Sequence, residues 1–273
     1  MTATWQRRGG MAAMVFLGVA ATVLAGDYNP SDPTVEMFSA MQRGDIAVKF
    51  IPKDSTQARV LIENKTDRPL NVKLPDAFAG VPVLAQSGRS GRSGGSSRDS
   101  SSGNQSSGGG MGGMGGGMGM FNIAPEKVGQ LKVTTVCLEH GKREPNERMA
   151  YEIRPLESVT SKPGVRELCQ LLGNGKISQR AAQAAAWHLN NDMSWQQLAA
   201  KQLRFTNGTS RSYFTADELH GGMELCSAAI RLAKENENAS KVKPQADQPA
   251  SEAPIVEESL KTLRHRKARP NSD

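Results

Sequence analysis

The sequence has 273 residues and a formal net charge of +7, with 22% charged and 37% hydrophobic residues. The length allows one or two domains, and the charge suggests an anionic partner until it is apportioned along the chain. A net charge of +2 lies in each of three segments, 1–26, 88–119 and the tail from 241, which leaves +1 for the rest. Because this remainder is nearly neutral and carries no DNA- or RNA-recognition motif, nucleic acid is excluded as an expected partner.

The first residues have the pattern of a secretory signal peptide. Arg7 and Arg8 precede an apolar run over 11–24, and small residues follow at Ala25 and Gly26. A helix needs roughly 20 apolar residues to cross a bilayer, so this run favours a cleaved signal peptide over 1–26, with an uncleaved anchor as the alternative. No second apolar stretch of that length follows. The mature chain is therefore expected without a transmembrane segment, secreted or held in the periplasm or cell envelope.

The next part of the chain predicts a β-sandwich. Residues 27–44 contain two prolines and one short helical candidate, which is typical of an N-terminal tether. From Asp45 the chain shows runs rich in Val, Ile and Leu, separated by turn residues. These predicted strands cover 46–51, 58–63, 70–74, 81–85, 121–123, 129–138 and 149–154. We expect an immunoglobulin-like sandwich over 45–156 and an α+β protein overall.

A Gly/Ser/Met-rich insertion over 87–119 interrupts these strands. Its composition buries too little apolar surface to offset its backbone entropy, which predicts a disordered loop. Thioethers are soft ligands for Cu(I), so the methionines of this region are weak candidates for a copper site. They are Met111, Met114, Met118 and Met120. The alternative is that they are filler in a flexible segment, and in that case no cofactor is expected.

The pattern becomes helical over 157–236, which predicts a small helical subdomain packed on the sandwich. Ser178 is placed to cap a helix that carries an alanine-rich apolar stripe. Capping-box patterns begin at Ser194 and Thr215, and the second opens a longer helix. Residues 237–273 turn polar, basic and proline-containing, and we expect them to form a disordered tail.

Three cysteines, Cys137, Cys169 and Cys226, belong to a chain expected in an oxidising compartment. Cys169 and Cys226 both fall in predicted helices, and they are a candidate disulfide that would leave Cys137 as the odd thiol. The alternative is that all three are small buried hydrophobic residues.

One pair of motifs carries candidate chemistry: VCLEHGK, which places Cys137 at the end of a strand, and AAQAAAW, which places Gln183 on a helix. Together they resemble the thioester domains of bacterial surface adhesins, over about a quarter of the chain. That resemblance implies an internal thioester between Cys137 and Gln183, used once for covalent attachment to a partner's amine. Val136 stands where those domains usually have an aromatic residue, and no sorting signal or stalk repeats follow.

Elementary chemistry gives the same pair a role, because a thiolate can attack a carboxamide and release ammonia. His140 and Lys142 are positioned to supply a cationic neighbourhood that lowers the pKa of Cys137, and His140 is the candidate assisting residue. The alternative is that Cys137 is core packing and that Gln183 is a capping or exposed amide.

The whole arrangement is also similar to uncharacterised exported proteins of planctomycete bacteria, which implies an envelope location. The four histidines have no metal-ligand spacing with the cysteines, and no Ser/His/Asp order can be assembled. We therefore expect a non-enzymatic binding or structural protein whose partner is an envelope or surface protein or polymer. The alternative function is copper binding by the methionine-rich loop.

Overall fold

The computed structural model describes residues 28–83, 104–111, 119–175 and 177–242. The predicted signal peptide over 1–26 lies outside the described residues, as does most of the predicted tail. The chain divides into two units, Met1–Ala233 and Lys234–Asp273. All contacts discussed below belong to the first unit.

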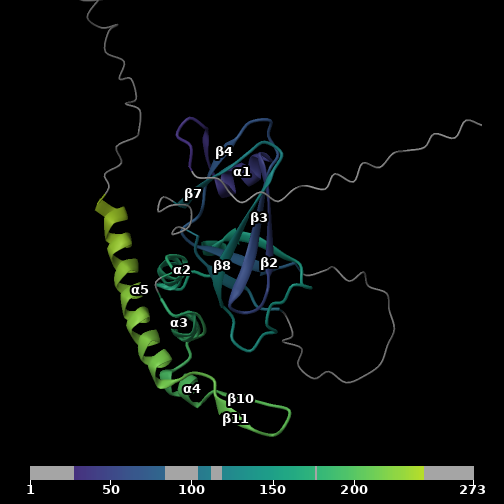
Figure 1. Ribbon diagram of the computed structural model, residues 1–273. Coiled ribbons are helices and arrows are strands. Elements are labelled where there is room, and N and C mark those ends of the chain that lie inside the picture. Colours follow the sequence, from purple (N-terminus) through teal and green to yellow (C-terminus); the bar gives the residue numbers. More distant parts are fainter. Residues whose placement is uncertain (1–27, 84–103, 112–118, 176, 243–273) are drawn as a thin grey trace, which may run out of the picture. The chain divides into compact units, whose positions relative to one another are not determined.

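A closed six-stranded barrel forms the centre of this unit (Figure 1). All of its neighbouring strands pair antiparallel, and the Phe50–Tyr151 pair joins the last strand to the first. In order around the ring the strands are β2 (Ile46–Pro52), β3 (Gln57–Asn64), β8 (Val128–Cys137), β6 (Ser107–Gly109), β5 (Phe78–Pro82) and β9 (Tyr151–Pro155). Apolar side chains from these strands, among them Phe50, Val60 and Ile153, are buried in the core.

The barrel corrects the predicted sandwich. Alternating apolar residues show that a strand has one buried face, but they do not show which strands meet, so the same pattern suits a sandwich and a barrel. The deciding strand is β6, because it pairs with both β5 and β8 and so bridges the two halves of the ring. Its sequence, Ser-Gly-Gly, has no strand signature, and it lies in the insertion that was expected to be disordered.

Glycine is needed in β6 and just after it because neighbouring groups come very close. A Cβ atom at Gly109 would lie 2.8 Å from Cζ of Phe78, and one at Gly110 would lie 2.4 Å from the carbonyl oxygen of Cys169. Of the predicted disordered insertion over 87–119, the segment 104–111 is thus ordered, and residues 105–111 are buried. Residues 84–103 and 112–118 lie outside the described part.

The segment expected as a tether over 27–44 is partly built into the core. Strand β1 (Thr34–Glu36) pairs parallel with β4 (Leu70–Lys73), which pairs antiparallel with β7 (Met120–Ile123). Helix α1 (Met37–Arg43) follows directly, and the Glu36 carboxylate accepts hydrogen bonds from the first free N–H groups of this helix. Met37 and Ala40 of α1 are fully buried. A tether would not bury them.

Four helices follow the barrel, as the sequence predicted for this region, together with a short 3-10 turn, η2 (Leu156–Ser158). The helices are α2 (Val165–Gly173), α3 (Gln179–Asn191), α4 (Trp195–Ala200) and α5 (Ala216–Val242). The Ser178 cap and the capping box between Ser194 and Gln197 are confirmed. Thr215 and Glu218 exchange the same reciprocal pair of bonds.

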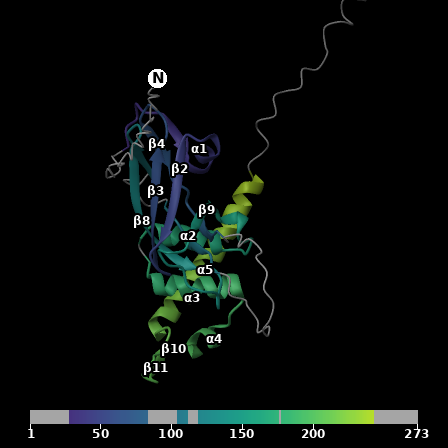
Figure 2. The same cartoon turned by 90° about the vertical axis from the view of Figure 1, so that its right-hand side faces the viewer.

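The two views agree on how these parts of the first unit are arranged. Helix α1 and strand β4 lie toward one end of β2 and β3, and α3 lies toward the other end (Figure 2). A short hairpin of β10 (Gln202–Arg204) and β11 (Ser210–Ser212) follows α4. Within the described ranges, no helix combines the length and the apolar character needed to cross a membrane.

Candidate functional site

The structure brings Cys137 and Gln183 together, but through the main chain of the cysteine. The Cys137 N–H donates to Oε1 of Gln183 at 2.8 Å, and Nε2 of Gln183 donates to the Cys137 carbonyl at 2.9 Å. Both residues are buried. The Cys137 thiol is 3.9 Å from the carbonyl oxygen of Ser55. The carboxamide is therefore held by two peptide groups, as if it belonged to a neighbouring strand.

Gln183 is one of four amide side chains by which α3 lines the edge of β8 and the residues after it. The register between β3 and β8 ends at the Gln57–Thr134 pair, and one further main-chain bond joins the Thr135 N–H to the Thr56 carbonyl. Beyond that bond, no described strand pairs with this side of β8. The amides of α3 occupy that position. In addition to Gln183, Gln179 donates to the Thr135 carbonyl, Asn190 donates to the Leu138 carbonyl, and Asn191 accepts from the His140 N–H.

The environment of the Cys137 thiol is the reverse of the expected one. Burial raises the pKa of Cys137, and the carboxylates of Glu144 and Asp54 raise it further. The predicted cationic neighbourhood is not formed, because Lys142 pairs with Glu139. His140 instead hydrogen bonds to Lys201, with 2.8 Å between Nε2 and Nζ.

The His140 ring also lies edge-on to the ring of Trp187. Burial lowers the pKa of His140, and the charge of Lys201 lowers it further. Because its own pKa is raised, the Cys137 thiol is protonated at neutral pH, and no hydrogen bond joins it to His140 in the described part of the chain. The internal thioester stays a prediction, and the structure supplies no activated nucleophile for it.

The candidate disulfide is not formed, since Cys137, Cys169 and Cys226 are all free and buried. Cys169 on α2 and Cys226 on α5 belong to one apolar cluster, with Leu168 and Ala182 among its members. Burial of apolar area between the barrel and these helices accounts for their positions. This is the alternative that the sequence left open.

The candidate copper ligands are divided. Met111 is fully buried in the barrel core, and Met120 lies on β7 and is half-buried. Met114 and Met118 lie outside the described residues. In the described ranges, no group of three or more His, Cys, Asp or Glu is placed to hold a metal ion.

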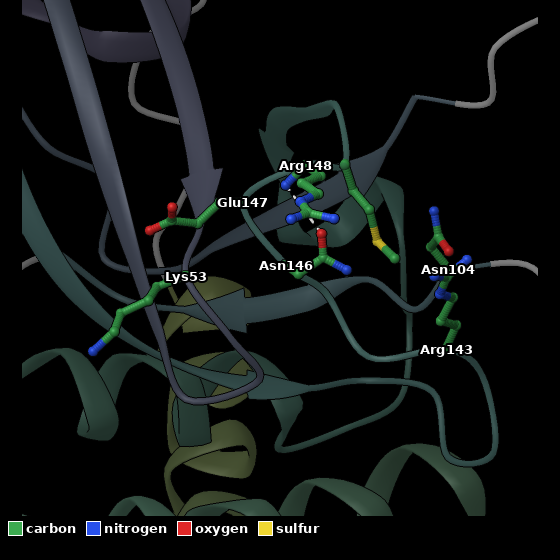
Figure 3. A pocket seen from close by; sticks show the side chains of 7 residues that line it. Lys53, Asn104, Arg143, Asn146, Glu147 and Arg148 are labelled. Carbon is green, nitrogen blue, oxygen red and sulfur yellow. Dashed lines mark hydrogen bonds between the residues drawn. The ribbon is translucent and has the colours of Figure 1, made fainter.

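A basic pocket lies where the β2–β3 turn meets the loop between β8 and β9 (Figure 3). Its volume is about 610 Å³, within the range of small-molecule sites. In Figure 3, Lys53 and Glu147 lie at one side of it and Asn104 and Arg143 at the other. The lining residues are Lys53, Asn104, Arg143, Asn146, Glu147, Arg148 and Met149.

Main-chain bonds fix the loop that carries most of these side chains. The Gln105 N–H donates to the Arg143 carbonyl, which ties the loop to the residues before β6. The Asn146 side chain accepts from the Arg148 N–H at 3.0 Å, and the Met149 N–H donates to the Asn146 carbonyl. Met149 packs against the barrel core. The charged side chains of this loop are thus carried on a backbone that is held at several points.

The charges of the pocket are unbalanced. Three cationic side chains, those of Lys53, Arg143 and Arg148, line it together with one carboxylate, that of Glu147. Glu147 itself pairs with Arg59 at 3.4 Å. Neither Arg143 nor Arg148 has an ion-pair partner among the residues that the structure describes. A cavity lined by an excess of one charge raises the local concentration of the opposite charge.

Sequence reasoning missed this pocket because it averaged the charge over the folded part. The sequence does contain a local indication of a basic loop. Arg143 and Arg148 lie close together in a segment rich in turn residues, which are Gly141, Pro145 and Asn146. Lys53 and Asn104 are far away in sequence, and tertiary contacts bring them to the loop, Asn104 through an isolated bridge to Arg143.

The fold and the site define a mixed α+β protein in which a closed antiparallel barrel carries a basic pocket at the end of its β2–β3 turn. No protein-family model matches the chain, and no curated protein or solved structure matches it either.

Proposed function

We propose that this protein is a non-enzymatic binding protein that holds an anionic ligand in the basic pocket. The observation that carries the proposal is the pair of guanidinium groups, Arg143 and Arg148, which line a cavity with Lys53 and lack ion-pair partners in the described part of the chain. Arginine presents paired N–H donors that match the two oxygens of a carboxylate, phosphate or sulfate group.

The other lining residues suit a ligand that also carries hydroxyl groups. The side chains of Asn104 and Asn146 offer both donors and acceptors at the same cavity. Met149 is the one apolar residue of the lining. A ligand held here would be recognised by charge and hydrogen bonds, with little burial of apolar surface.

Binding without turnover is supported by the composition of the lining. It contains no His, Cys, Ser or Tyr, and its one carboxylate, that of Glu147, pairs with Arg59 and not with a nucleophile of the described lining. The signal-peptide pattern of the sequence supports a location outside the cytosol. A surface or envelope polymer that carries acidic groups is then a natural partner class.

The test compares two ligands that differ in one carboxylate. The protein is titrated with galacturonic acid and with galactose at low ionic strength, and binding is followed by NMR shifts of the loop that contains Arg143. We expect shifts with the acid alone and weaker binding as salt is added, because exposed charge interactions are screened.

Variants assign the binding to the pocket. Arg143→Gln with Arg148→Gln should weaken binding at least tenfold, which corresponds to about 1.4 kcal/mol for the two exposed contacts together. Arg68→Gln, an exposed arginine outside the pocket lining, is the matched control and should change nothing. Equal binding of galactose and galacturonic acid would refute the proposal.

A further inference from the structure

The basic pocket continues into a second one along the outside of the barrel. The second pocket, of about 390 Å³, lies over strands β3 and β8. It shares Lys53 and Glu147 with the first pocket, so the two pockets are adjacent. Its own cations are Arg59 and Lys132. Together the two pockets form a basic track from the loop of Arg143 to the middle of β8.

The second pocket contains a pair of like charges that strand pairing forces together. Arg59 on β3 and Lys132 on β8 are direct register partners, so their side chains leave the sheet on the same face. Like charges directly opposite each other on paired strands destabilise a sheet. Glu147 pairs with Arg59, and Lys132 has no ion-pair partner in the described residues. A bound anion would relieve this repulsion.

The side chains of the track favour a hydroxyl-rich polyanion over a single-stranded nucleic acid. Neither pocket has an aromatic residue in its lining, although single-stranded nucleic acids are usually held by bases stacked on aromatic rings. The uncharged polar groups of the lining are instead amides and a hydroxyl, at Asn104, Asn146, Gln57 and Thr134. Amides and hydroxyls suit a chain that offers many hydroxyl groups of its own.

We infer that the ligand is an acidic polysaccharide chain that spans both pockets and places successive carboxylates against the cations of the two pockets. The inference rests on the proposed function, since it extends the same site. It assigns Arg143 and Arg148 to one part of the chain and Arg59 and Lys132 to another, with Lys53 between them.

The experiment measures affinity against ligand length with the full protein. Galacturonic acid and oligogalacturonides of increasing length are titrated at one fixed salt concentration. We expect the affinity to rise with length and then to reach a plateau once both pockets are filled. Lys132→Gln should lower the affinity for long chains about fivefold more than that for the monomer, whereas Arg143→Gln should lower both.

The controls keep the two proposals distinguishable. Lys127→Gln changes an exposed lysine outside both pockets and should have no effect. If the affinity does not depend on length while Arg143→Gln still weakens monomer binding, the chain-binding inference fails and the anion pocket stands. If neither the monomer nor the oligomers bind, the proposed function of anion binding is itself refuted. A single-stranded DNA that binds as tightly as the longest oligogalacturonide would show that the polymer class is wrong.

Discussion

The carboxamide of Gln183 and the main chain of Cys137 exchange two hydrogen bonds, at 2.8 and 2.9 Å, in a buried position. Each partner satisfies both a donor and an acceptor of the other. Such a pair behaves like one more rung of a β-ladder, with a side chain in place of the peptide group.

Removing the carboxamide should destabilise the protein. Gln183→Met keeps most of the side-chain volume but leaves the buried N–H and C=O of Cys137 without partners, and each such group costs about 1–3 kcal/mol. We expect the free energy of unfolding in urea to fall by about 2–6 kcal/mol. Gln196→Ala, an exposed glutamine on α4, is the control and should stay within about 0.5 kcal/mol of the wild type. An unchanged urea midpoint for Gln183→Met would show that the two bonds contribute nothing.

The intact mass of the protein tests the thioester directly. Formation of the thioester would join Sγ of Cys137 to the carbonyl carbon of Gln183 and release one ammonia, so the mass would fall by that amount. We expect the full mass, because burial holds the thiol protonated and because the amide nitrogen donates to the Cys137 carbonyl. A mass lower by one ammonia that Cys137→Ala restores would establish the thioester and overturn our interpretation of Gln183.

Alkaline pH should destabilise the fold through Cys169. Burial raises the pKa of Cys169 to about 12, with a further contribution from the Glu167 carboxylate. Above the ordinary thiol pKa of about 8.5, the unfolded chain has lost this proton and the folded chain has kept it. The folded state then binds more protons, so the free energy of unfolding decreases as pH rises, by at most about 1.4 kcal/mol per pH unit for this group.

A Cys169 variant separates the contribution of this thiol from those of the tyrosines and lysines, which titrate in the same pH range. Cys169→Ala should start slightly less stable at pH 8, because it loses buried volume. Its stability should then fall less steeply than that of the wild type up to about pH 10.5, as measured by urea unfolding at each pH. Parallel curves for the two proteins would contradict the raised pKa.

Local chemistry made part of this fold predictable. The caps at Ser178 and Ser194 were readable because a capping side chain bonds to N–H groups two or three residues away, so the whole interaction lies in a short stretch of sequence. The strands over 46–51 and 129–138 were readable for a similar reason, because their alternation reports one buried face.

Closure of the barrel could not be predicted from the sequence, because it depends on β6, a strand that no local sequence pattern marks. Ser107, Gly108 and Gly109 form β6 by pairing with β5 and β8, and their neighbours leave little room for a side chain at Gly108 or Gly109. The same holds at the site. Cys137 and Gln183 were expected to meet, but whether the thiol or the main chain of Cys137 contacts the carboxamide depends on how α3 packs against β8. The basic pocket depends on residues from three distant segments.

The row of amides on α3 has a further consequence for the solubility of the protein. An unpaired strand edge presents N–H and C=O groups that can recruit a strand from another molecule. The part of β8 that continues past the end of β3 would be such a template. There the side chains of Gln179 and Gln183 bond to the main chain of β8, and a side chain cannot extend a sheet. Helix α3 thereby covers main-chain groups that could otherwise pair with a strand of another molecule, so displacing α3 from β8 would expose them.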